Sequence, residues 1–309
     1  MLACALVGDT IMKSRELFDS EFGRAAARWI SGVVLAGLTF SCGGPSDADR
    51  AEAVRLNESG LQQYRQAAFP AALQQFLAAV KLDATNPEYA NNAGMSYLQM
   101  GDAGRAAPFF QQALELKPDE AMYHYNIGLA FQAAQDREMA VAAFLKAGAL
   151  RPDYFDAHAY AGALLFEAGV YSDAVESWER AVAIRPEADL LSNLGVAYMQ
   201  LDDLEAADRV LRESIAKDPG YADAYYNMGV LRQKQRNNDA AVQNYRKALQ
   251  LDPNKLAAYM NLGLLLMKQK DRSGAAHNFE EFIRRAPPDA MPAQIADARK
   301  RLAELVPRR

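Results

Sequence analysis

Apolar residues recur at helical spacing along most of the chain. The stretch AAPFFQQALEL shows the pattern clearly, because Ala106, Phe109, Phe110, Ala113 and Leu114 fall on one face of a helix. A helix with one apolar face buries that face against a neighbouring helix. The pattern therefore predicts an all-α protein built from paired helices.

The helical pattern also repeats along the chain with a nearly constant period. Seven glycines follow one another at steps of 34 or 33 residues: Gly60, Gly94, Gly128, Gly162, Gly195, Gly229 and Gly263. Twelve residues after each comes an alanine: Ala72, Ala106, Ala140, Ala174, Ala207, Ala241 and Ala275. Four residues further on stands a large apolar residue: Phe76, Phe110, Phe144, Trp178, Leu211, Tyr245 and Phe279. A proline closes all units except the first, which has Ala84 there: Pro118, Pro152, Pro186, Pro219, Pro253 and Pro287.

Each of these positions has a physical reason in a pair of antiparallel helices. Two helices approach closely where their side chains are small, so we expect each glycine to face the alanine of its unit. The large apolar residue would fill the space beside that contact, and proline would end the second helix.

This helix–turn–helix unit resembles the tetratricopeptide repeat (TPR). The resemblance covers residues 53–289 as seven repeats, and it implies a right-handed α-solenoid. The stretch MPAQIADARKRLAELV (291–306) is predicted to form a capping helix, within a segment 290–309 that ends in a basic tail.

A candidate binding site follows from two further positions of the repeat. Asparagine stands two residues before the glycine in five units; we call Asn92, Asn126, Asn193, Asn227 and Asn261 the asparagine ladder. Apolar residues stand one residue after the glycine; we call Met95, Leu129, Val196, Val230 and Leu264 the apolar row. In the resembled family the first helix of each repeat lines a groove that holds extended peptides in some members, which implies that both sets contact peptide.

Two interpretations of the asparagine ladder remain open. An asparagine side chain offers donors and an acceptor, which suits it to holding a peptide backbone whatever the peptide's side chains are. The same asparagine could instead bond only to the neighbouring repeat. Some of the apolar row, and the nearby Leu98, Met199 and Met267, could likewise be core between helices.

The first 52 residues have a different character. Arg24 and Arg28 precede the apolar stretch WISGVVLAGLTFS (29–41), which is too short to cross a bilayer but has the form of a signal-peptide core. Cys42 follows it, and the segment resembles a bacterial lipoprotein signal, in which lipid is attached to the cysteine. This predicts a signal peptide over 1–41 and a lipidated Cys42 with a flexible tether over 42–52. Met12 is an alternative initiator to Met1.

These features predict where the protein works. A lipidated Cys42 followed by Gly43 resembles an outer-membrane lipoprotein, so we expect the periplasmic face of the bacterial outer membrane and segments of envelope proteins as partners. Repeat lipoproteins of this form resemble pilotins and adaptors of cell-wall hydrolases. Two alternatives stay open: an uncleaved anchor that holds a cytoplasmic scaffold at the inner membrane, and a substrate-presenting or regulatory subunit of a separate enzyme, such as a cell-wall hydrolase or glycosyltransferase.

Nothing in the sequence predicts catalysis, a cofactor or a nucleic-acid partner. It lacks a phosphate-binding glycine loop, an HExxH motif and a nucleophile elbow, and its net charge is −5. His124 and His158 occupy equivalent positions in adjacent repeats, where a metal site is conceivable but aromatic packing is usual in the family. Asp202 and Asp203 are expected to solvate a turn.

Overall fold

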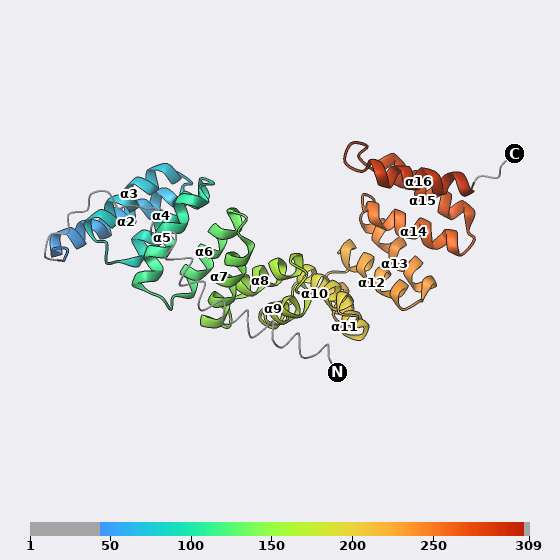
Figure 1. Cartoon of the computed structure of the whole chain (residues 1–309), viewed down its shortest axis with the longest axis horizontal. Helices are drawn as coiled ribbons and strands as arrows, with labels where there is room; N and C mark the ends of the chain where they lie inside the picture. Colours follow the sequence, from blue (N-terminus) through green and yellow to red (C-terminus); the bar gives the residue numbers. More distant parts are fainter. Residues whose placement is uncertain (1–43, 306–309) are drawn as a thin grey trace. The chain divides into compact units, whose positions relative to one another are not determined.

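The computed structural model describes residues 44–305, and all of its helices belong to this part of the chain. Within it, fifteen helices form seven pairs followed by a single last helix (Figure 1). The pairs are α2 (Asp47–Arg65) with α3 (Phe69–Leu82), α4 (Pro87–Gln99) with α5 (Ala103–Leu116), α6 (Ala121–Ala133) with α7 (Arg137–Leu150), α8 (Phe155–Glu167) with α9 (Tyr171–Ile184), α10 (Ala188–Gln200) with α11 (Leu204–Lys217), α12 (Ala222–Lys234) with α13 (Asn238–Leu251), and α14 (Leu256–Lys268) with α15 (Arg272–Arg285). The last helix is α16 (Pro292–Leu305), in the segment predicted to cap the array. The prediction of an all-α repeat fold is confirmed.

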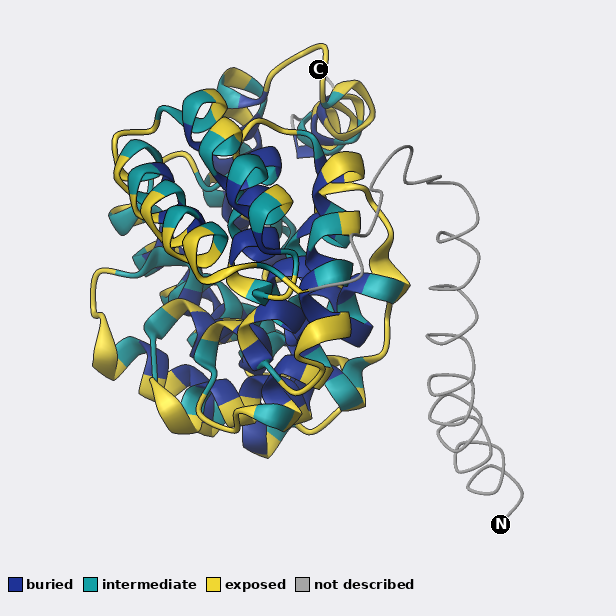
Figure 2. Cartoon of the chain, turned by 90° about the vertical axis from the view of Figure 1, so that its left-hand side faces the viewer, coloured by how far each residue is buried: buried dark blue, intermediate teal, exposed yellow. Residues whose placement is uncertain are grey.

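Contacts divide the chain into two compact units, with the boundary between Lys146 and Ala147, inside α7. In each unit the buried side chains come from both helices of a pair and from the next first helix. One cluster joins Phe110 of α5 to Tyr123 of α6, and another joins Tyr245 of α13 to Leu262 of α14. Buried and exposed positions alternate along each helix in Figure 2, as the helical period of the sequence predicts.

The repeat glycine packs against the large apolar residue of its unit. A Cβ built on Gly128 would lie 2.8 Å from the Phe144 ring, and one built on Gly229 would lie 2.6 Å from the Tyr245 ring. In all seven repeats the three atoms nearest to such a Cβ belong to the large residue. The large side chain thus fills the space that the missing side chain of glycine leaves, as the sequence predicts for this position, whereas contact between glycine and alanine stays a prediction.

Every pair turns at one residue with left-handed backbone conformation, seven positions after the repeat glycine. These residues are Ala67, Gly101, Gln135, Gly169, Asp202, Arg236 and Lys270, with φ between 58° and 79°. The conformation ends the first helix and reverses the chain, and glycine is the residue that adopts it at least cost. Only two repeats use glycine there, so the other five hold a strained residue in the turn.

The next residue starts the second helix. Five repeats place Asp or Asn there, and its side chain accepts a hydrogen bond from the backbone N–H three residues later: Asp102, Asp136, Asp203, Asn237 and Asp271. These residues satisfy an amide that has no partner within the helix. Asp202 and Asp203 are thus more than solvating groups, because Asp202 forms the turn and Asp203 caps α11.

The second helices end two residues before the closing proline, for instance at Leu116 before Pro118 and at Ile184 before Pro186. The first repeat ends at the same place without a proline. There Asp83 accepts hydrogen bonds from the N–H of Thr85 (3.0 Å) and from its hydroxyl, which forms an Asx turn.

The first helix begins earlier than expected. Ser46 and Asp49 form a capping box, in which the Asp49 N–H donates to the Ser46 hydroxyl and the Ser46 N–H donates to the Asp49 carboxylate, both at 3.1 Å. Helix α2 consequently starts at Asp47, and residues 47–52 of the predicted tether are helical. Cys42 and the predicted signal peptide lie outside the described residues.

Candidate peptide-binding face

The asparagine ladder and the apolar row lie on the first helices α4, α6, α10, α12 and α14. In each repeat the two residues are three positions apart, which places them on the same face of the helix. This face is where the sequence predicts peptide contact, and the structure shows what each side chain already touches.

Four ladder asparagines donate a hydrogen bond from their side-chain nitrogen to the preceding repeat, 35 residues earlier. The bonds are Asn92 to Asn57 Oδ1 (2.9 Å), Asn126 to Asn91 Oδ1 (2.7 Å), Asn227 to Ser192 Oγ (2.9 Å) and Asn261 to the Tyr226 hydroxyl (3.1 Å). All four acceptors stand three residues before the repeat glycine. The ladder therefore joins consecutive first helices, which is one of the two interpretations left open by the sequence. Contact with a peptide stays a prediction.

Asn193 is the exception. The residue 34 positions earlier is Ala159, whose methyl group cannot accept a hydrogen bond, and the Asn193 side chain is exposed. Within residues 44–305 its amide makes no hydrogen bond. Among the ladder residues of the described chain, Asn193 thus has both its donors and its acceptor available to a ligand.

The apolar row is half-buried in all five repeats. Each member contributes part of its surface to the core or to the neighbouring helix and leaves the rest accessible; Met95, Val196, Val230 and Leu264 pack against the buried clusters. Three residues further along, Leu98 and Met267 are also half-buried, whereas Met199 is only 3% exposed and belongs to the core. Within each unit the first helices therefore present partly exposed apolar side chains.

Tyr226 adds a polar group to this face. Burial raises the pKa of its phenol, while the hydrogen bond from Asn261 acts in the opposite direction. The phenol therefore stays protonated at neutral pH and keeps an O–H donor while it accepts from Asn261.

The two histidines singled out from the sequence have a structural role. The Nε2 atom of His124 lies 2.7 Å from the Pro118 carbonyl oxygen, and Nε2 of His158 lies 3.1 Å from the Pro152 carbonyl oxygen. Each buried imidazole thus donates to the carbonyl of the proline that closes the preceding second helix. No three metal-ligating side chains gather anywhere in residues 44–305, and no helix there has the length and apolarity to cross a bilayer.

Family comparisons support the repeat assignment. Sequence profiles of the tetratricopeptide repeat match residues 87–120, 161–222, 222–255 and 257–288. The helix pairs are tetratricopeptide repeats. No curated protein matches the TPR chain at a significant level.

Solved structures give the same fold. PilF of Pseudomonas aeruginosa has a TM-score of 0.54 and 21% identity, covering 71% of this chain and 97% of that one. YrrB, described as a TPR protein with an unusual peptide-binding site, has a TM-score of 0.50 and 21% identity, covering 63% and 99%. A TPR protein from Parabacteroides merdae has a TM-score of 0.54 and 14% identity, covering 82% and 99%. At these identities the similarity shows a shared fold.

The acceptors of the ladder are harder to find in the sequence than the asparagines. Asn57 and Asn91 are of one type, but Ser192 and Tyr226 are not, so no single residue type marks all four. What they share is an oxygen atom at one position of the repeat, and the spacing of 35 residues to the next asparagine would have identified them.

Proposed function

We propose that the TPR chain is a non-catalytic scaffold that binds extended peptide segments along the face formed by the asparagine ladder and the apolar row. The observation that carries this proposal is the apolar row, which is half-buried in five separate first helices. Within each unit, accessible apolar side chains that recur at one repeat position form a surface on which side chains of an extended peptide can be buried.

The polar groups beside this row support the same function. Asn193 has its amide unused, so it can bond to a peptide backbone without breaking a contact between repeats. YrrB, which shares the fold, is a TPR protein with a peptide-binding site of its own. We propose peptide binding for this chain because of its own apolar row and the unbonded Asn193 side chain.

We further propose that the chain is anchored through a lipid on Cys42 at the periplasmic face of the outer membrane and binds segments of envelope proteins, as a pilotin or assembly adaptor does. The supporting features are the positive flank, the apolar core 29–41 and the cysteine that follows it. Several acyl chains on one cysteine would provide lasting attachment, since a single chain binds membranes only marginally.

Photo-crosslinking in native membranes tests the binding face. Tyr160 takes the ladder position in the fourth repeat and is 38% exposed, so p-benzoylphenylalanine at Tyr160 places a crosslinker of similar shape on this face. Tyr225 gives a matched control, because it stands two residues from Asn227 and so about 200° around the helix. We expect envelope proteins crosslinked through extended segments at Tyr160 but not at Tyr225. Equal crosslinking at both sites would contradict the proposal.

Intact mass of the membrane-extracted protein tests the anchor separately. A chain that begins at Cys42 and carries acyl mass is expected, and Cys42→Ser is expected to abolish both the cleavage and the added mass. An unmodified full-length chain would refute the lipid anchor and leave the binding face to be judged on the crosslinking result alone.

A further inference from the structure

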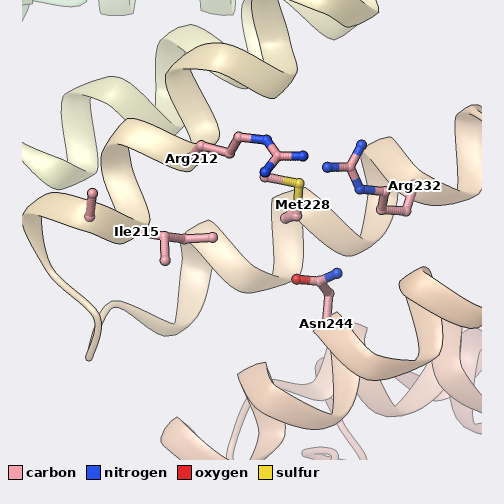
Figure 3. Close-up of a pocket in the computed structure, with 6 residues that line it drawn as sticks. Arg212, Ile215, Met228, Arg232 and Asn244 are labelled. Atoms are coloured by element: carbon pink, nitrogen blue, oxygen red, sulfur yellow. The ribbon is translucent and has the colours of Figure 1, made fainter.

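A cavity of about 450 Å³ lies in the second unit, between the sixth repeat and the second helix of the fifth. Its lining residues are Arg212, Ile215 and Ala216 of α11, Met228 and Arg232 of α12, and Asn244 of α13. Figure 3 shows the Arg212 and Arg232 side chains pointing toward one another above Met228, while Asn244 points into the same space. We call this cavity the arginine pocket.

The arginine pocket results from two polar residues, Arg232 and Asn244, at positions that the second, third and fifth repeats fill with apolar ones. Arg232 stands three residues after the repeat glycine, where the flanking repeats have the buried Tyr198 and Leu266. In the second repeat the corresponding pair, Tyr97 and Phe109, stacks with ring centroids 5.5 Å apart. Arg232 and Asn244 replace such a pair in the sixth repeat, so the space is lined with polar groups there.

Asp208 fixes both arginines and leaves the pocket positive. Its carboxylate accepts from Arg212 Nε at 2.8 Å and from Arg232 Nη2, while Arg232 Nη1 donates to Gln235 at 2.6 Å. The Arg232 side chain is 15% exposed, so its orientation is set by these partners. The guanidinium groups of Arg212 and Arg232 together with the Asp208 carboxylate carry one net positive charge. Arg212 bonds to Asp208 through Nε, so its two terminal nitrogens can still donate hydrogen bonds to a ligand.

We propose that the arginine pocket binds a monocarboxylate that carries an apolar group. A guanidinium group donates two parallel hydrogen bonds to a carboxylate, and one net positive charge matches a monoanion better than a dianionic phosphate. Met228, Ile215 and Ala216 supply an apolar wall for the rest of the ligand. The volume lies within the range of small-ligand sites.

This site is separate from the peptide-binding face and goes beyond the proposed function. Arg232 stands five residues after Asn227 on α12, which places it about 140° around the helix from the asparagine ladder. A ligand in the arginine pocket and a peptide on the ladder therefore contact different sides of the same helix.

Titration of the full chain, followed through the arginine Nε–Hε resonances, tests the proposal. N-acetylleucine is expected to shift the Arg212 and Arg232 resonances saturably. Acetate is expected to bind about tenfold more weakly, because it buries no apolar side chain. The neutral N-acetylleucinamide is expected to leave the resonances unchanged, and inorganic phosphate is expected to bind more weakly than N-acetylleucine.

Two variants, one of them a matched control, test whether N-acetylleucine binds in the arginine pocket. Arg232→Met restores an apolar residue at this position while Arg212 still pairs with Asp208, so it is expected to fold and to bind N-acetylleucine at least about tenfold more weakly. Arg246→Ala removes the arginine equivalent to Arg212 in the next repeat, where Leu266 replaces Arg232, and is expected to bind as wild type. The proposal is overturned if Arg232→Met binds normally, if the amide shifts the same resonances, or if acetate or phosphate binds as tightly as N-acetylleucine.

Discussion

At the scale of single residues, one repeat position has two different roles. Asn126 is 5% exposed and bonds to Asn91, which is 4% exposed, whereas Asn193 occupies the same position and is exposed without such a bond. The difference comes from the preceding repeat, because Asn91 offers an oxygen and Ala159 does not. The same residue type at one position of the repeat can therefore have different roles in different repeats.

The Asn126→Ala and Asn193→Ala variants separate the two roles. Asn126→Ala leaves the buried Asn91 oxygen without its donor and is expected to destabilise the first unit by about 1–2 kcal/mol. Asn193→Ala is expected to change stability by less than about 0.5 kcal/mol but to weaken peptide binding. Urea unfolding midpoints measure the change in stability, and the affinity for a peptide measures the change in binding. Equal losses of stability in the two variants would show that Asn193 also joins repeats.

Substitutions at two turn residues are expected to change the stability of the fold in opposite directions. Ala67 has φ 58° in the turn of the first repeat, so Ala67→Gly is expected to stabilise the fold by about 1 kcal/mol. Gly169 has φ 78°, and a Cβ there meets nothing within 4 Å, so Gly169→Ala is expected to destabilise by a similar amount through backbone conformation alone. Thermal unfolding of both variants checks the signs, and a stabilised Gly169→Ala would refute the explanation.

At the scale of elements, side chains hold both ends of two second helices, α5 and α7. Asp102 and Asp136 cap their starts, and the carbonyl of each closing proline accepts a hydrogen bond from a histidine of the next first helix. Burial lowers the pKa of His124 and of His158, and the bonds to Pro118 and Pro152 partly oppose that effect. The Nδ1 atom of His124 is buried without a partner, so a proton there would find no acceptor.

Because the pKa values of both histidines are lowered in the folded chain, we expect the fold to lose stability in acid. Above about pH 6.5 the imidazoles are neutral in both the folded and the unfolded chain, and their full contribution to the free energy of unfolding is present. As the pH falls below that value, the unfolded chain takes up protons that the folded chain resists, so the folded state loses stability until the pH reaches the lowered pKa. Urea midpoints between about pH 7.5 and 5 measure this decline.

His124→Gln provides the comparison, since glutamine keeps a donor but does not titrate. Its urea midpoint is expected to fall less steeply than that of the wild-type chain over the same pH range. An unchanged slope would mean that other groups cause the acid sensitivity and that His124 does not contribute.

At the scale of the whole molecule, the last helix covers an apolar surface that the repeat pattern would otherwise leave open. Phe282 of α15 is 2% exposed and shares a buried cluster with Ile295 and Ala298 of α16. The Arg272 guanidinium donates to the Leu305 carbonyl oxygen at 2.9 Å and so fixes the end of α16 to the start of α15. Helix α16 therefore acts as a cap on the last repeat.

Truncation tests the cap. A chain that ends at Pro288 lacks α16, and the exposed Phe282 face is expected to make it self-associate in a concentration-dependent way, as measured by sedimentation velocity. A chain that ends at Leu305 keeps the helix and is expected to sediment like the full chain. A monomeric truncated chain would show that α16 is dispensable for covering this face.

The repeat number, the helix pairs and the capping helix are predictable from the sequence alone. These follow from short-range effects, such as apolar periodicity and the closing prolines, which act the same way in every repeat. The start of α2 could also have been found there, since the Ser46–Asp49 capping box is a local pattern.

Which side chains meet between repeats follows only from the folded arrangement of the helices. The ring against the repeat glycine, the oxygen that each ladder asparagine reaches and the cavity beside Arg232 all depend on pairs of residues far apart in the chain. In the ladder the asparagine repeats in the sequence, but the residue that it reaches changes from repeat to repeat, and Arg232 occurs at its position in the sixth repeat alone. For that reason the positions of the candidate site could be predicted, whereas the availability of Asn193 and the existence of the arginine pocket could not.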